Sequence, residues 1–318
     1  MSASGLSESN RLDGTRVLVV GGNGFIGRHV LRALTAQGAD VAVMDVSGPD
    51  DEFNGLEWVI GNLTDRPLFA SAVAGCDQVI FLANSSLPAS ANNDLSSEVE
   101  AHVQVSVKAA EISHSLGVRR FIFASSGGTV YGVDSDAPIT EDTRTFPRNA
   151  YGVSKLAIEH YLRVMTMLRG MQTVSLRISN PYGEGQRALR NQGFIAAAMS
   201  HGISGKPLPI WGDGAVERDF IHVSDVARGI VAACAVDTPP GTVNIGSGQA
   251  RSLLDVLKEV EAALGRPVPV TFEPARAIDV KRNVLDVERA RKTLGWRPEV
   301  SMPDGLARTA AWWKARMG

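Results

Sequence analysis

Short apolar runs and amphipathic helical patterns alternate along about the first 180 residues of the chain. The apolar runs are rich in β-branched side chains, which is typical of strands that are buried on both faces. They predict strands at 16–21, 40–45, 56–60, 77–82, 119–125 and 172–178. Helical patterns fall near 25–37, 65–73, 96–116 and 150–169. This α/β alternation predicts a Rossmann-type doubly wound parallel sheet, with ligands bound at the carboxyl ends of its strands.

The pattern changes after residue 180. Loops rich in Gly, Pro and Arg at 181–193 and 204–219 are interrupted by a helix near 193–202. A strand near 241–245 is expected to return to the main sheet, and the remaining predictions are a strand at 268–272 and helices at 252–264, 286–294 and 303–316. We therefore predict a dinucleotide-binding domain of residues 14–180 plus about 220–246. A smaller, discontinuous α/β substrate domain of residues 181–219 and 247–318 should cap it, with the site in the cleft between them.

Composition and charge argue against several classes of protein. The 318 residues carry a net charge of −2, which argues against a nucleic-acid or membrane partner. No apolar run is long enough to span a bilayer, and residues 1–13 lack the apolar core of a signal peptide. We expect a disordered N-terminal tail and a cytoplasmic protein. Cys76 and Cys234 are too few for a disulfide framework, and the histidines show no metal-ligand spacing, so buried thiols and no metal are predicted.

A glycine-rich turn follows the first strand. The run Val17-Leu18-Val19-Val20 leads directly into Gly21-Gly22-Asn23-Gly24-Phe25-Ile26-Gly27. Glycines at this place let a pyrophosphate approach the backbone, and the N–H groups of the next helix can hold it. Asp45 ends the second strand, 18 residues after Gly27. Its carboxylate can bind both ribose hydroxyls and repel a 2′-phosphate, which favours NAD over NADP. The alternative is an ordinary turn with a surface aspartate.

A second motif, Tyr151-Gly152-Val153-Ser154-Lys155, lies on a predicted helix. Tyr151 and Lys155 are at i and i+4 and so share a face. A free tyrosine has a pKa of about 10, and a nearby ammonium together with an oxidised nicotinamide would lower it. Ser126 ends the strand before this helix and is placed to bind the reacting hydroxyl. Taken alone, the pair could be a surface helix pair and the serine a turn residue.

With these motifs, the chain resembles the extended short-chain dehydrogenase/reductases. Within them it is most similar to the NAD-dependent sugar-nucleotide epimerase/dehydratase group and its UDP-glucose 4-epimerase-like members. The resemblance runs from about Arg16 to Trp313. Beyond the two motifs above, it rests on Thr129-Val130-Tyr131-Gly132, Leu176-Arg177-Ile178-Ser179-Asn180-Pro181-Tyr182-Gly183, Trp211-Gly212-Asp213-Gly214, Arg218-Asp219-Phe220-Ile221-His222-Val223 and Leu294-Gly295-Trp296-Arg297-Pro298.

The resemblance implies a role for each matching residue. The cofactor NAD would contact Gly21, Gly24, Phe25, Ile26, Gly27, Asp45, Asn62, Leu63, Leu82, Ala83, Asn84, Tyr151 and Lys155. In this set Asn62-Leu63 would hold the adenine, and Leu82-Ala83-Asn84 would line the ribose and nicotinamide. The substrate would contact Ser126, Asn180, Arg218, Arg276 and Asp279. The two arginines would clamp its diphosphate and Asp279 would bind its nucleotide ribose. The catalytic residues would be Ser126, Tyr151 and Lys155.

Two departures from the family pattern stand out. The serine loop reads Ala124-Ser125-Ser126-Gly127-Gly128 before Thr129. Counting from the strand puts Ser126 at the catalytic position, whereas counting back from Thr129 puts Gly127 there. We prefer Ser126, with Thr129 as its substitute. The usual asparagine of the preceding helix is His102, and Ser106 replaces a glycine or threonine. Both should pack under the site, which indicates a subfamily rather than lost chemistry.

The predicted function is inversion of the C4 hydroxyl of a UDP-hexose, such as UDP-glucose or UDP-galactose, through a transient 4-keto intermediate. The alternatives are an epimerase, reductase or decarboxylase for a UDP-N-acetylhexosamine or UDP-uronic acid, and a nucleotide-sensing protein without turnover. A 4,6-dehydratase is disfavoured, because Gly128 and Thr129 replace the acid and base that elimination needs. By analogy with the family we also expect a homodimer formed by the helices near 96–116 and 150–169.

Overall fold

The core of the molecule is a seven-stranded parallel sheet. The computed structural model describes residues 12–84, 91–188, 193–276 and 279–317. The strands are β1 (Arg16–Val20), β2 (Asp40–Asp45), β3 (Glu57–Ile60), β4 (Gln78–Phe81), β5 (Arg120–Ser126), β6 (Gln172–Ile178) and β11 (Thr242–Ile245). Their order is β11-β6-β5-β4-β1-β2-β3, with every neighbouring pair parallel. The order reverses between β1 and β4, where sheets of this kind bind ligands. The predicted fold class is confirmed.

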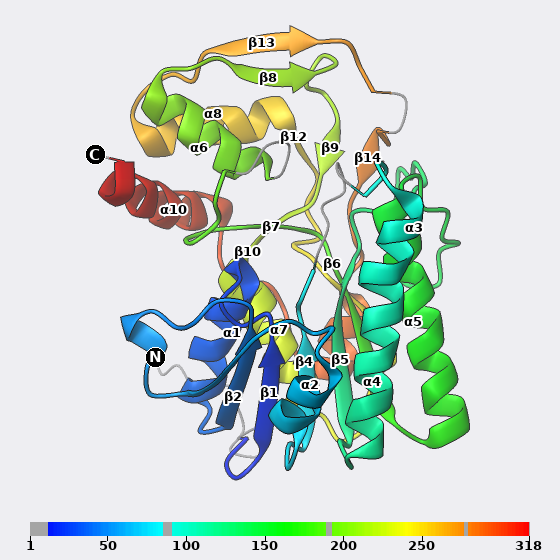
Figure 1. The fold of residues 1–318 in the computed structure, drawn as a ribbon. Helices are drawn as coiled ribbons and strands as arrows, with labels where there is room; N and C mark the ends of the chain where they lie inside the picture. The colour runs from blue at the N-terminus through cyan, green and yellow to red at the C-terminus, as the bar shows by residue number, and fades with distance from the viewer. Residues whose placement is uncertain (1–11, 85–90, 189–192, 277–278, 318) are drawn as a thin grey trace.

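Helices cover both faces of this sheet (Figure 1). One face packs against α1 (Phe25–Ala36), α7 (Val223–Ala235) and α9 (Glu288–Leu294). The other packs against α2 (Arg66–Val73), α4 (Val105–Ser115) and α5 (Ala150–Arg169). Two buried apolar clusters result, one on each face of the sheet.

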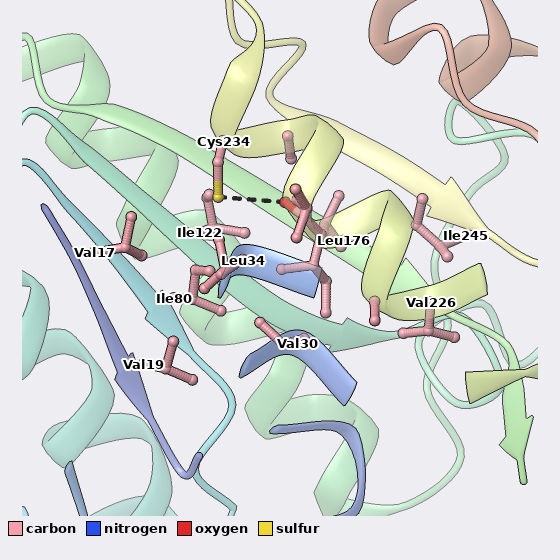
Figure 2. Close-up of a cluster of buried hydrophobic side chains, with 14 of the residues drawn as sticks. Val17, Val19, Val30, Leu34, Ile80, Ile122, Leu176, Val226, Cys234 and Ile245 are labelled. Atoms are coloured by element: carbon pink, nitrogen blue, oxygen red, sulfur yellow. Dashed lines mark hydrogen bonds between the residues drawn. The ribbon is translucent and has the colours of Figure 1, made fainter. Parts of the chain in front are cut away.

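Successive side chains along a strand point to opposite faces of the sheet, so a single strand contributes residues to both clusters. Val17 and Val19 of β1 point into the first cluster, and Leu18 and Val20 point into the second. Figure 2 shows Val17 and Val19 in the first cluster, where Cys234 also lies. Cys76 and Cys234 are both buried free thiols, as predicted.

A second group of elements lies at one end of the sheet (Figure 1). It contains α6 (Phe194–Ser204), α8 (Leu253–Leu264) and α10 (Met302–Met317), with the parallel pair β8 (Leu208–Trp211) and β13 (Val270–Glu273). These elements share a separate apolar cluster. Shorter pairs connect this group to the sheet: β7 (Asn180–Tyr182) with β10 (Phe220–His222), and β9 (Glu217–Arg218) with β12 (Arg251–Ser252) and β14 (Arg282–Asn283). The residue boundaries predicted for the two domains stay predictions.

Several elements differ from the sequence prediction. The helix expected at 96–116 consists of α3 (Leu95–Glu98), a π-helical segment η3 (Val99–Gln104) and α4. β8 lies in the segment 204–219 that was expected to be a loop, and α7 was not predicted. Residues 1–11 of the expected tail lie outside the described residues. Leu12, the first described residue, is buried in the core, and the predicted tail boundary stays a prediction.

Metal-binding clusters and membrane-spanning helices are both absent from the residues that the structure describes. No group of three or more His, Cys, Asp or Glu side chains is arranged to hold a metal ion. Among the described helices, none combines the length and the apolar character that a membrane crossing requires.

Candidate active site

A cavity of about 1720 Å³ lies at the carboxyl ends of the sheet strands and extends to the second group of elements. It brings together all of the residues predicted to contact cofactor or substrate: Gly21, Gly24, Phe25, Ile26, Gly27, Asp45, Asn62, Leu63, Leu82, Ala83, Asn84, Ser126, Tyr151, Lys155, Asn180, Arg218, Arg276 and Asp279. These residues come from segments as far apart as residues 21 and 279. Their roles in binding stay predictions, but their placement in one cavity supports a single site.

The glycine turn shapes the cavity where β1 meets α1. Gly21 has φ +84, and a Cβ there would lie 2.9 Å from the backbone N of Ala83. A Cβ on Gly27 would lie 2.6 Å from the carbonyl oxygen of Gly22. Side chains are thus excluded by both conformation and space. α1 begins without a side-chain cap and without an acidic residue in its first turn, so its N-terminus suits a diphosphate.

Asp45 sits at the end of β2, on the rim of the same turn. Its Oδ2 accepts a hydrogen bond from the backbone N of Asn23 at 3.0 Å, and its Oδ1 accepts from the backbone N and Oγ of Ser47, both at 3.2 Å. These bonds hold the carboxylate at the cavity wall. On another part of the wall, Asn62 accepts two bonds from Thr64, at 3.0 Å each, through Oδ1. The amide therefore orders its own loop.

The tyrosine–lysine pair lies on α5 as predicted. The helix starts at the N-cap Asn149, whose Oδ1 accepts a bond from the backbone N of Gly152 at 2.8 Å. Lys155 Nζ donates to the carbonyl oxygen of Ala124 at 2.9 Å, which ties the helix to the end of β5. The same Nζ lies 5.5 Å from the centroid of the Tyr151 ring. The cation and the phenol therefore share the cavity rather than a solvent-exposed face.

Burial controls the charge of both groups. It lowers the pKa of Lys155 to about 7, although the carboxylates of Glu98 and Glu159 act in the opposite direction. Burial, followed by the charge of Glu98, raises the pKa of Tyr151 above its ordinary value. The sequence argument expected a lower pKa for Tyr151 when a lysine ammonium and an oxidised nicotinamide are both beside it. That expectation stays a prediction, because it includes the charge of the cofactor.

The serine loop has two positions, 126 and 127, that counting along the sequence left open. A Cβ on Gly127 would lie 2.6 Å from Leu285 Cδ1, so position 127 faces the protein interior. A Cβ on Gly128 would instead lie 4.0 Å from Ser126 Oγ and 3.7 Å from Asn180 Oδ1. Ser126, Gly128 and Asn180 thus meet at one place in the cavity. This geometry supports Ser126 over position 127 as the catalytic side chain. Thr129 also lines the cavity, so it stays available as a substitute.

His102 lies beneath the tyrosine on the π-helical segment. Its ring centroid is 6.2 Å from that of Tyr151, and its side chain is buried. Burial and, to a lesser extent, the charge of Lys155 lower the pKa of His102 to about 3, so the imidazole is neutral near pH 7. Ser106, one helical turn further on, is buried and also lines the cavity. Both positions pack under the site, as the sequence suggested.

The basic end of the cavity contains the two predicted arginines. Arg218 Nη1 donates to the carbonyl oxygens of Glu217 and Val280, each at 2.9 Å. Burial lowers the pKa of Arg218, while the carboxylate of Asp279 acts to raise it. Arg276 Nε donates to Asp279 Oδ2 at 3.0 Å, and its guanidinium lies 4.5 Å from the centroid of the Trp211 ring. Two cations and one carboxylate therefore converge here.

The structure adds residues that the sequence reasoning did not identify. Arg28, Arg148, Trp312 and Trp313 all line the cavity. Arg148 Nε donates to the carbonyl oxygen of Gly132 at 2.8 Å. Its position three residues before Tyr151 could have identified Arg148 as a candidate site residue from the sequence. The tryptophans belong to α10, and no local pattern links that helix to the site.

Comparisons with known proteins agree with this arrangement. Residues 17–246 match the model of the NAD dependent epimerase/dehydratase family. The dTDP-4-dehydro-6-deoxyglucose reductase of Escherichia coli is 31% identical over 300 residues, covering 91% of this chain and 95% of that protein. UDP-glucose 4-epimerase of Thermus thermophilus, solved in complex with NAD, is 30% identical with a TM-score of 0.87, covering 94% and 99% of the two chains. MoeE5, solved with UDP-glucuronic acid and NAD, is 31% identical with a TM-score of 0.85, covering 95% and 100%.

Proposed function

Because the chain belongs to the NAD-dependent epimerase/dehydratase family, we propose that it inverts the C4 hydroxyl of a UDP-hexose through a transient 4-keto sugar. The observation that carries the proposal is the meeting of Ser126, Tyr151 and Lys155 in the cavity that also contains the glycine turn. A protein that only senses nucleotides has no need of a phenol and a buried amine placed together in the cavity. The enzyme uses NAD as its cofactor.

The residues present fit that cofactor. The uncapped N-terminus of α1 and the glycines before it would hold the diphosphate, and the Asp45 carboxylate would hold the adenosine ribose. Bound NAD supplies a group that can take up and return a hydride. The protein must then handle the proton, position the sugar and exclude water.

Tyr151 is the residue we assign to the proton of the sugar 4-hydroxyl. Its raised pKa disfavours the phenolate, so forming the phenolate would need the Lys155 ammonium and the positive charge of the oxidised cofactor. Ser126 would orient the hydroxyl by a hydrogen bond. Arg218 and Arg276 would retain the substrate diphosphate while the keto sugar turns over, because guanidinium groups pair well with phosphate oxygens. Gly128 leaves space beside Ser126 for that movement.

A second candidate is the same chemistry on a UDP-uronic acid. Arg148 lines the cavity three residues before Tyr151, where its guanidinium could pair with a sugar carboxylate. A neighbour of similar fold binds UDP-glucuronic acid, which supports keeping this candidate. A third candidate function is that of a reductase or decarboxylase, since one relative is named as a reductase.

Proton NMR of the anomeric region tests the reaction directly. Purified protein is mixed with UDP-galactose, without added cofactor, and compared with UDP-galacturonic acid under the same conditions. Signals of UDP-glucose are expected in the first sample, and they would establish both 4-epimerisation and retained NAD. Conversion only in the second sample would show that the substrate is a UDP-uronic acid and not a UDP-hexose. If neither sample changes after NAD is added, the 4-epimerase assignment fails for both sugars.

We also propose that the enzyme is a homodimer. Apolar side chains on one side of α5 are exposed: Val153, Tyr161, Val164 and Leu168, with Leu168 77% exposed. Leu95 and Val99, on the neighbouring helical segment, are exposed as well. Such a stripe suits a second copy of the same helices.

Light scattering after gel filtration should give twice the chain mass of 33.8 kDa at micromolar concentration. Val164→Glu with Leu168→Glu should give the single-chain mass, because two carboxylates would be buried without partners. Phe272→Glu, at an exposed apolar residue outside this stripe, serves as the control and should leave the dimer intact. A single-chain mass for the unmodified protein would rule the dimer out.

A further inference from the structure

A chain of hydrogen bonds connects the Asp45 carboxylate to a cation. Asp45 accepts bonds from the backbone N of Asn23 and from Ser47. The Asn23 side-chain amide donates to Ser47 Oγ at 2.9 Å and to the carbonyl oxygen of Gly48 at 2.8 Å. Its Oδ1 accepts from Arg28 Nη1 at 3.1 Å. Only Asn23 therefore separates the guanidinium of Arg28 from the proposed ribose-binding carboxylate.

Arg28 itself lines the cavity, and its side chain is 23% exposed. Its Nη2 forms an ion pair with Asp50, and Glu52 Oε2 lies 3.6 Å from the same nitrogen. The guanidinium also lies 5.2 Å from the centroid of the buried Phe53 ring. The cation is thus held against the segment 47–53 by Asp50, at the rim of the cavity.

We propose that Asp50 is a second determinant of NAD selectivity, because it occupies the Arg28 guanidinium that would otherwise bind a 2′-phosphate beside Asp45. The adenosine ribose of NADP carries a dianionic phosphate where NAD has a hydroxyl. That phosphate would be repelled by Asp45 and Asp50 together. Arg28, the cation proposed to lie nearest to the phosphate, would already be paired with Asp50.

This arrangement predicts that removing Asp45 alone is insufficient to admit NADP. An arginine fork binds phosphate well only when its N–H groups are free to face it. Releasing Arg28 from Asp50 should add one charge-assisted contact to a 2′-phosphate, which corresponds to roughly a tenfold gain in affinity or more. The proposal does not depend on which sugar the enzyme uses, since it concerns the cofactor alone.

The test measures which nucleotide the protein holds. Each purified variant is dialysed to equilibrium against equal concentrations of NAD and NADP, and the bound nucleotides are released with acid and quantified by chromatography. Asp45→Ala should raise the bound NADP:NAD ratio only modestly. Asp45→Ala with Asp50→Ala should raise it by a further factor of roughly ten. Adding Arg28→Ala to that pair should remove most of the further gain.

Two matched controls separate this effect from a general loss of negative charge. Asp51→Ala in the Asp45→Ala background removes a neighbouring carboxylate for which no ion pair with Arg28 is found among the described residues. Arg32→Ala in the doubly substituted background removes the cation one helical turn further on, which pairs with Glu52. Neither control should change the ratio more than twofold.

The proposal is overturned if the Asp50 and Asp51 substitutions have equal effects. It is also overturned if removing Arg28 leaves the gain in NADP unchanged. If the double variant is unstable, Asp50→Asn alone provides an independent test. This substitution keeps Asp45 and the side-chain volume at position 50. It should raise the NADP:NAD ratio above that of Asp51→Asn, and equal ratios would contradict the proposal.

Discussion

Replacing Tyr151 by phenylalanine is expected to lower the turnover number by roughly a hundredfold to ten-thousandfold. The substitution removes one oxygen from a partly buried side chain and keeps its ring, so the packing changes little. It removes the group that we assign to the proton of the sugar hydroxyl. Lys155 would remain beside the ring position, with its Nζ donating to the carbonyl oxygen of Ala124.

The measurement compares steady-state kinetics and bound NAD for this variant and for Tyr161→Phe. Tyr161 is on the same helix, but its side chain is 53% exposed and lies outside the cavity. The control should keep normal turnover, and both variants should retain NAD. If Tyr151→Phe keeps more than half of the normal turnover number, the assignment of the proton to Tyr151 is wrong.

Replacing Glu159 by leucine is expected to lower the free energy of unfolding by about 3–5 kcal/mol. Glu159 and Arg177 form a buried ion pair, with Arg177 Nη2 2.7 Å from Glu159 Oε2 and side-chain exposures of 7% and 5% for the arginine and the glutamate. Ser125 Oγ also donates to Glu159. Leucine would leave the guanidinium buried without its carboxylate. That uncompensated charge, rather than the loss of attraction, dominates the effect.

Denaturant unfolding measures this change in stability. The double variant Glu159→Leu with Arg177→Met should recover much of the loss, because no unpaired charge remains. Glu111→Ala breaks the partly exposed pair with Lys108 and should cost less than about 1 kcal/mol. A loss below 1 kcal/mol for Glu159→Leu would show that Arg177 finds another partner, or water, in the variant.

The same ion pair supports the active site. Glu159 lies one helical turn after Lys155, and its partner Ser125 precedes Ser126 on β5. The carboxylate therefore ties together α5, β5 and β6 beneath the proposed catalytic residues. Its charge also acts to raise the pKa of Lys155, against the larger effect of burial.

Some elements escaped prediction because their sequences lack a local signature. α7 buries most of its surface, including Val226, Ile230 and Cys234, and only a narrow stripe that contains Ser224 and Arg228 is partly exposed. β8 contains Pro209 and pairs with β13 about 60 residues later in the chain. A short strand of that kind becomes recognisable only when its partner is known.

The sequence by itself determined those features that depend on a few neighbouring residues. The glycine turn, the acidic end of β2 and the i, i+4 pair on α5 are set by backbone freedom and by the periodicities of strand and helix. The alternation of apolar runs likewise determined the parallel sheet. These local rules predicted the glycine turn, Asp45, Tyr151 and Lys155, whereas the remaining substrate and cofactor residues were implied by the family resemblance; all of them line one cavity.

Only the tertiary structure decided how those residues are charged and which distant residues join them. Burial is a property of the whole fold, and it lowers the pKa of Lys155 and raises that of Tyr151. The pairing of Arg28 with Asp50 likewise depends on how the segment after β2 folds against α1. Desolvation and ion pairing arise between segments remote in sequence, so no local pattern could reveal them.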